Sequence, residues 1–156
     1  MANRVQRQHL RELMGYLLAH KAAVHYPPHD ERTRRASEIQ TEAELRSSVQ
    51  AGTFMFDCSQ TVEIMCVVVG LHWPRPMVNG YTGTMLEYLP HYTNPAAAGL
   101  GALCVVGPYP GEHVWMVAAP GHDPLLWGNG SEAGPDEIRY SQEARRPRVF
   151  LSIAHL

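Results

Sequence analysis

The chain has 156 residues, of which 45% are hydrophobic, and a formal net charge of −2. A chain of this length can bury one sizeable core, so we expect a single domain over residues 1–156. The charge balance gives no general reason to expect nucleic-acid binding. The first 35 residues are locally basic, which fits either a solvated helix face or contact with an anionic polymer such as a cell-wall glycan or a membrane surface.

The cysteines and the N-terminal stretch narrow the class of protein further. Three cysteines leave at least one free, and none forms a C-x-x-C pair, so we expect neither a disulfide scaffold nor a zinc site of that type. The N-terminal stretch interrupts its apolar residues with charges, unlike a signal peptide, and no later run reaches transmembrane length. We therefore expect synthesis in the cytoplasm without a signal peptide and no stable membrane insertion.

The first half of the chain carries helical patterns. Apolar residues recur every three or four positions from Val5 to Leu18, as on one face of an amphipathic helix. Thr41 and Glu44 have the spacing of a capping box, which marks a second helix start. A run beginning at Ser59 is apolar nearly all round after a polar opening, as expected of a buried helix. The predicted helices cover about residues 3–24, a segment within 37–50, residues 59–69 and a short stretch near 84–89.

The second half changes to short apolar or alternating runs bounded by Gly or Pro, which predict strands. Helices that precede strands in this way indicate an α+β fold, with the N-terminal helices packed on a small antiparallel β-sheet. The predicted strands lie within residues 101–107, 112–119, 124–130 and 148–156.

Cys58 stands between Asp57 and Ser59, where a short apolar run turns into the predicted buried helix. The unpaired N–H groups at a helix start favour a thiolate and lower the pKa of a cysteine there. This position makes Cys58 a candidate nucleophile. Cys66 and Cys104 lie among valines and leucines, so we expect both to pack in the core.

A nucleophilic cysteine needs a base and a polar group that orients the base. His113 opens the strand within 112–119, and Asn129 ends the strand that follows. In an antiparallel pair the end of one strand lies beside the start of the other, so we expect Asn129 to reach the imidazole of His113. Ordinary alternatives stay open: a partly buried strand histidine at His113, and a turn residue at Asn129.

The order of these motifs resembles that of the NlpC-type cysteine peptidases, which cleave peptidoglycan peptides. The shared set is "DCS" before an apolar helix, a "GAL" strand, "HV" heading the next strand, and a polar residue that ends the strand after it. The stretches "NGYTGT", "EHVWMV" and "GNGSEAGPDEIRYS" are similar to catalytic domains of endolysins from phages of actinobacteria. The resemblance spans roughly residues 20–142 and implies a papain-like cysteine peptidase core.

The resemblance also implies a role for individual residues. The third catalytic position, more often histidine in the family, is asparagine here, as in the Cys-His-Asn triads of papain-like enzymes. A tyrosine hydroxyl would face the oxyanion together with the Cys58 backbone N–H; Tyr26 matches this position, and Tyr16 is the alternative. The expected residues are Cys58 as nucleophile, His113 as general base, Asn129 as third member, Tyr26 at the oxyanion, and Asp57, Ser59 and Trp127 in substrate binding.

The function implied is hydrolysis of peptide bonds in peptidoglycan stem peptides through a thioester, at the bond between D-glutamate and diaminopimelate. The resemblance implies no cofactor and a monomer. It also implies action at the bacterial cell wall after release through a holin or a secretion machine.

Other readings of the sequence stay open. The same fold can carry a toxin-type deamidase or acyltransferase, or a catalytically silent domain for wall binding or assembly. A metal site among His20, His25, His29 and Asp30 matches no ligand spacing, and the prolines at 27–28 prevent a shared helix face, so we expect no metal.

Overall fold

The computed structural model describes residues 1–131 and 133–156 and has the predicted α+β class. Four α-helices alternate with short 3₁₀ turns before and around one six-stranded sheet. The helices are α1 (Arg4–Ala19), α2 (Glu42–Gln50), α3 (Cys58–Val68) and α4 (Thr82–Tyr88). The strands are β1 (His91–Tyr92), β2 (Leu103–Val106), β3 (His113–Ala119), β4 (Leu125–Gly128), β5 (Asp136–Arg139) and β6 (Arg148–Leu151).

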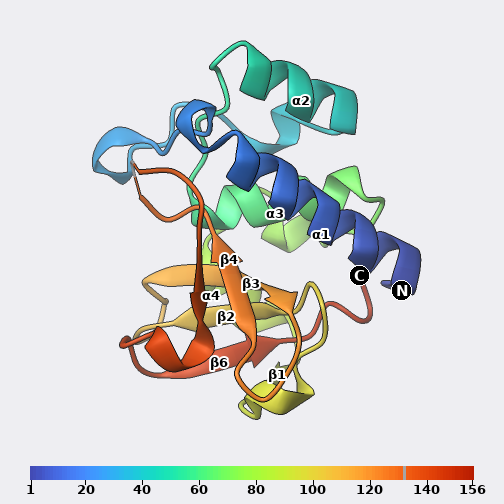
Figure 1. The fold of residues 1–156 in the computed structure, drawn as a ribbon, viewed down its shortest axis with the longest axis vertical. Helices are drawn as coiled ribbons and strands as arrows, with labels where there is room; N and C mark the ends of the chain where they lie inside the picture. The colour runs from blue at the N-terminus through green and yellow to red at the C-terminus, as the bar shows by residue number, and fades with distance from the viewer. Residues whose placement is uncertain (132) are drawn as a thin grey trace.

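The sheet has the strand order β1-β6-β2-β3-β4-β5, and all neighbouring pairs are antiparallel. Figure 1 shows α1, α2 and α3 gathered on one side of the molecule and the strands on the other, with the two chain ends side by side. Ala2 N–H donates to the Ala154 carbonyl at 3.2 Å, which joins these ends. The predicted packing of N-terminal helices on an antiparallel sheet is therefore confirmed.

Side-chain alternation divides the sheet into two buried faces. On β3, Val114 and Met116 face α3 and the main core, whereas Trp115 and Val117 belong to a second cluster on the other face. Because successive strand residues point to opposite faces, this pattern also decides where the polar residues at the strand ends lie. No helix in the described part of the chain combines the length and apolarity that crossing a bilayer requires.

The predicted helix starts are accurate. Thr41 caps α2 by accepting a hydrogen bond from Glu44 N–H at 3.2 Å, and α3 is buried from Cys58 to Cys66 as predicted. α1 ends at Ala19 rather than near residue 24, because the chain tightens into a 3₁₀ turn after it.

The two edge strands, β1 and β5, were not predicted from the sequence. β1 has two residues, and the sequence of β5 is mostly charged, so neither shows the apolar alternation from which strands are predicted.

Candidate active site

Cys58 is the first residue of α3 and is 8% exposed. Asp57 caps the helix: its Oδ1 accepts from Gln60 N–H at 2.9 Å, and its own N–H donates to Gln60 Oε1 at 3.2 Å. This reciprocal cap fixes the direction in which the chain enters the helix. The thiol opens into a hollow of about 160 Å³, here called the cysteine hollow. It is lined by Tyr26, Asp30, Asp57, Cys58, Ser59, Tyr81, Thr82, Gly111 and Glu112.

Burial dominates the electrostatics of the thiol. It raises the pKa of Cys58 to about 11, and the Asp57 charge adds to the rise, while the backbone N–H groups of Val114, Ser59 and Cys58 oppose it. The expectation that the helix start alone lowers this pKa is therefore wrong. Near neutral pH the residue is a thiol, and it needs a base to become a nucleophile.

His113 is the first residue of β3, as predicted, but its ring lies on the sheet face that carries Trp115. The two rings meet edge to face, with centroids 4.4 Å apart. The imidazole rests over Gly128 and Gly130, where an added Cβ would come within 2.7 Å of Nε2 and 2.4 Å of Cε1, respectively. His113 borders its own hollow of about 200 Å³, here called the histidine hollow, which Arg145 also lines.

His113 is buried without a strong partner. Burial, followed by the nearby positive charge of Arg145, lowers its pKa to about 3, and the Glu143 carboxylate only partly opposes this. Nε2 is buried and has no hydrogen-bond partner in the described part of the chain. The ring is therefore a neutral imidazole, which is the form that a general base requires.

Asn129 does not bond to His113, so the predicted contact between them is wrong. The β3/β4 register pairs Met116 with Trp127, and its continuation sets Asn129 opposite Val114. Asn129 therefore points to the helix side of the sheet, where its Nδ2 donates to the Phe56 carbonyl at 3.0 Å and to Thr61 Oγ1 at 3.2 Å. The prediction that the end of β4 lies beside the start of β3 is correct, but the sheet face on which Asn129 lies was not predicted.

The three expected catalytic residues thus gather where α3 and β3 begin and β4 ends, without the hydrogen bonds of a triad. Among the described residues, no hydrogen bond joins Cys58 to His113 or His113 to Asn129. The Oδ1 atom of Asn129 is, like His113 Nε2, buried and unpartnered.

A third hollow adjoins both the cysteine hollow and the histidine hollow. This middle hollow of about 210 Å³ shares Tyr26 and Asp30 with the cysteine hollow, and residues 130–131 with the histidine hollow. The three hollows therefore neighbour one another on the surface near Cys58 and His113.

Tyr26 lines the cysteine hollow, whereas the alternative, Tyr16, does not. Burial raises the pKa of Tyr26, and the nearby Cys58 and Asp30 raise it further, so its hydroxyl keeps its proton. Tyr16 lies on α1, beneath the guanidinium of Arg46, which is 4.1 Å from its ring centroid. Of the two tyrosines, only Tyr26 can offer a hydroxyl to an oxygen bound at Cys58.

The three expected substrate-binding residues have different surroundings. Asp57 and Ser59 line the cysteine hollow, and the Ser59 hydroxyl donates to Asp57 Oδ1 at 2.9 Å. Trp127 is fully buried in the main core, opposite Met116, so the expectation that it binds substrate is wrong. The side chain of Trp127 lies on the helix-facing side of the sheet, where it packs within the main hydrophobic core.

Several polar residues around the site were not predicted. Arg32 bonds to Asp57 and Ser59 on either side of Cys58, and Glu112 and Arg145 border the two hollows. Arg32 belongs to a basic stretch whose sequence looks like solvated surface. Its contacts reach the start of α3 and the turn at residues 79–80 before α4, and no local pattern encodes contacts at such distances along the chain.

No three histidine, cysteine, aspartate or glutamate residues in the described ranges come close enough together to hold a metal ion. The histidines considered for such a site make other contacts: His20 Nδ1 bonds to the Tyr16 carbonyl at 2.8 Å, and His25 N–H donates to the Phe54 carbonyl at 2.9 Å.

Comparison with known proteins adds no family to this geometry. No protein-family model matches the chain, and neither a curated protein nor a solved structure matches it. What the site can do follows from its own residues and contacts.

Proposed function

We propose that the chain is a cysteine peptidase of bacterial peptidoglycan, with Cys58 as nucleophile and His113 as general base in a papain-like arrangement. The observation that carries the proposal is that Nε2 of His113 and Oδ1 of Asn129, both near Cys58, are buried without partners in the described part of the chain, as are Trp127 Nε1 and Tyr16 Oη elsewhere in the core. Buried polar atoms in folded proteins are nearly always hydrogen-bonded, so orphaned ones call for an explanation. A Cys-His-Asn triad uses the two near Cys58.

Activation requires the imidazole to leave Gly128 and Gly130 and to pass around the first residue of β3 to the helix side of the sheet, because His113 and Asn129 lie on opposite faces. Catalytic hydrogen bonds are often long or misaligned before substrate binds and tighten only in the complex. On the helix side one ring nitrogen takes the Cys58 proton and the other donates to Asn129 Oδ1, which gives both orphaned atoms a partner. The three neighbouring hollows offer the substrate a place beside both groups.

The reaction then follows the chemistry of an activated thiolate. Cys58 attacks a peptide carbonyl, and the oxyanion accepts hydrogen bonds from the Tyr26 hydroxyl and the Cys58 backbone N–H. His113 returns the proton to the leaving amine, which leaves a thioester on Cys58. Water, deprotonated by the same imidazole, hydrolyses the thioester and restores the thiol.

The proposed substrate is a peptidoglycan stem peptide, cut between D-glutamate and diaminopimelate, as the motif resemblance implies. We place the action at the bacterial cell wall after release through a holin or a secretion machine, and propose that the chain works as a monomer. Hollows of 160–210 Å³ in a row suit an extended peptide better than a bulky rigid ligand.

Mass spectrometry of actinobacterial peptidoglycan fragments tests the proposal, with wild-type protein, Cys58→Ala and the matched control Cys66→Ala. Cys66 is fully buried in α3 away from both hollows. Wild type and Cys66→Ala should release new amine termini whose masses identify the bond, and Cys58→Ala should not. Unchanged fragments in all three samples would overturn the peptidase proposal. Ammonia release without cleavage would replace it with deamidation.

A further inference from the structure

Arg32 lies nearly buried beside Cys58, with 11% of its side chain exposed. Its Nε donates to Asp57 Oδ2 at 2.6 Å, and its Nη2 donates to Ser59 Oγ at 3.0 Å. These acceptors belong to the residues immediately before and after the thiol. One guanidinium therefore holds both chain neighbours of Cys58.

The same guanidinium also binds the turn that forms another wall of the cysteine hollow. Nη1 donates to the Asn79 carbonyl at 2.7 Å, and Nη2 donates to the Gly80 carbonyl at 2.7 Å. The guanidinium carbon lies 3.9 Å from the ring centroid of Tyr81, a cation–π contact, and Tyr81 lines the hollow. Arg32 thus ties the start of α3 to the turn at residues 79–81.

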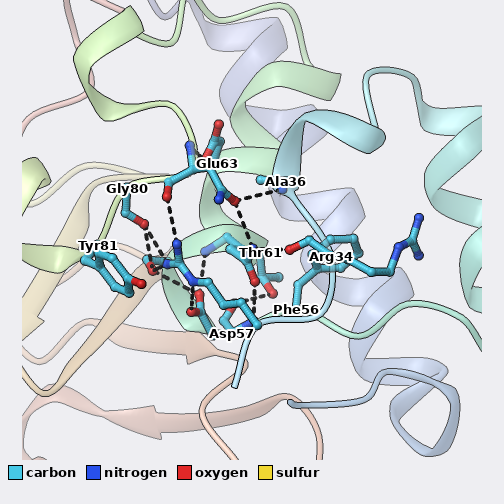
Figure 2. A network of polar contacts seen from close by, with 12 residues as sticks. Arg34, Ala36, Phe56, Asp57, Thr61, Glu63, Gly80 and Tyr81 are labelled. Atoms are coloured by element: carbon cyan, nitrogen blue, oxygen red, sulfur yellow. Dashed lines mark hydrogen bonds and ion pairs between the residues drawn. The ribbon is translucent and has the colours of Figure 1, made fainter. Parts of the chain in front are cut away.

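That turn is itself held in a defined direction by α3. Asn79 has a left-handed backbone, with φ +51°, which persists where the surroundings over-determine it. Its N–H donates to Glu63 Oε2 at 2.8 Å, and its Oδ1 accepts from Gln60 Nε2 at 2.9 Å and from Ala36 N–H at 3.0 Å. Figure 2 shows the labelled Gly80 and Tyr81 beside Asp57 within this network.

The charge of Arg32 acts on the thiol through Asp57. After burial, the Asp57 charge is a further cause of the raised pKa of Cys58. The 2.6 Å ion pair offsets that negative charge, because opposite charges in contact reduce the field each exerts on its surroundings. The other titratable and charged groups near the thiol are Tyr26 and Asp30, which precede Arg32 in the same segment, and Glu112 and Arg145, which come from the sheet side. In the described part of the chain none of them bonds to Arg32.

We propose that Arg32 is a positioning residue for Cys58: it locks the start of α3 against the turn at residues 79–81 and neutralises Asp57 beside the thiol. The proposal rests on the proposed role of Cys58 as nucleophile. Arg32 touches no reacting atom and acts through Asp57 and Ser59. Lysine at this position keeps the charge but cannot present donors in the fork that reaches four acceptors, and methionine removes both charge and donors.

The pH dependence of Cys58 alkylation by iodoacetamide, followed by peptide mass spectrometry, tests the proposal without relying on any substrate. Arg34 supplies the matched control: it lies two residues away in the same segment, and its Nη1 donates to the Thr53 carbonyl at 2.6 Å, but it does not contact Asp57. Arg32→Met should shift the alkylation midpoint to higher pH, and Arg34→Met should leave it at the wild-type value.

Stem-peptide kinetics separate positioning from charge. Arg32→Lys should keep the alkylation midpoint near that of wild type, while kcat falls about 10- to 100-fold from misplacement of the nucleophile and KM changes less than about twofold. Arg34→Lys should keep wild-type kcat. Near-ultraviolet circular dichroism identifies folded variants, and Arg32→Lys carries the test if Arg32→Met does not fold.

The results distinguish this proposal from the proposed function. Folded Arg32 variants with the same alkylation profile and kcat as their Arg34 counterparts would overturn the positioning role. If wild-type protein cleaves no stem peptide, the peptidase proposal fails. The positioning role then stands or falls on whether the rate and midpoint of Cys58 alkylation change in the Arg32 variants alone.

Discussion

The two sides of the candidate site differ in how completely their polar groups are bonded. On the Arg32 side, one guanidinium reaches Asp57, Ser59 and two backbone carbonyls, and all these bonds lie between 2.6 and 3.0 Å. On the His113 side, His113 Nε2 and Asn129 Oδ1 are buried without a partner in the described part of the chain, and the ring rests on glycines. The surroundings of Cys58 are thus held in place, whereas the His113 ring has no hydrogen bond through Nε2.

This difference separates two requirements of catalysis. A nucleophile must be held at a fixed position before reaction, because small misplacements cost rate. A base can complete its hydrogen bonds when substrate arrives. The Arg32 side is therefore the bonded side of the candidate site, and the His113 side is its open side.

Removing the base should have the largest effect on rate. His113→Ala should lower kcat/KM on a stem peptide by about 10²- to 10⁴-fold, the size of a general-base contribution. His9→Ala is the control, since His9 bonds to Glu42 at 3.1 Å on the helical side. Equal rates for His113→Ala and His9→Ala would show that the open side takes no part in the reaction.

Breaking the bonded side should have the largest effect on stability. Asp57→Ala removes the cap of α3 and leaves Arg32 with an uncompensated charge, so the free energy of unfolding should fall by about 3–5 kcal/mol. Urea denaturation measures it. Asp57→Asn, which retains a capping oxygen, should lose less. If both variants lose under about 1 kcal/mol, the network does not hold α3.

The buried Glu63 links this network to pH. Burial raises its pKa to about 7 from 4.5, although the Asn79 N–H bond and Arg32 and Arg35 oppose the rise. The folded state then holds the proton more tightly than the unfolded state, so the contribution of Glu63 to stability is fully present below about pH 4.5. This contribution should fall by about 3 kcal/mol as pH rises to 7.

Urea denaturation of Glu63→Gln between pH 4.5 and 7 tests the direction of this change in the free energy of unfolding. The variant should lack the part of the fall that Glu63 causes. Glu42→Gln is the control with the opposite effect. The hydrogen bond from Arg46 lowers the pKa of Glu42, desolvation opposes this, and His9 lowers the pKa further. The wild-type carboxylate therefore adds stability as pH rises. A stability curve for Glu63→Gln with the same slope as wild type would contradict the prediction.

Filling the space under the imidazole should have the smallest effect. In Gly130→Ala the new Cβ would lie 2.4 Å from His113 Cε1, so we expect a loss of about 1–3 kcal/mol. Gly15→Ala, which meets nothing within 4 Å on α1, should be neutral or stabilising. The cost of Gly130→Ala should shrink in a His113→Ala background. An unchanged cost there would show that the ring does not rest on this glycine.

Local signals in the sequence were enough to predict much of the scaffold. The Thr41/Glu44 spacing and the polar opening after Cys58 indicate where α2 and α3 begin, and the apolar runs locate β2, β3, β4 and β6. Cys58 at the start of a buried helix and His113 at the head of a strand follow from the same signals.

The orientation of side chains at the strand ends could not be predicted in this way. A change of one residue in register moves every side chain to the other face, and the β3/β4 pair contains an irregularity between Val117 and Ala119. The resemblance placed Asn129 and Trp127 in the site, and the proximity of strand ends supported Asn129, but neither signal indicated that both side chains face the helices. The role of Arg32 depends on contacts 25 to 48 residues away, which no local spacing records.

The measurement that tests the central claim most directly is the rate of stem-peptide cleavage as a function of the fraction of Cys58 alkylated. Cys66 and Cys104 are fully buried, so iodoacetamide under native conditions should modify Cys58 first, which peptide mass spectrometry verifies. The account predicts that cleavage declines in proportion to Cys58 alkylation and stops when it is complete. A protein fully alkylated at Cys58 that still cleaves at the wild-type rate would contradict it.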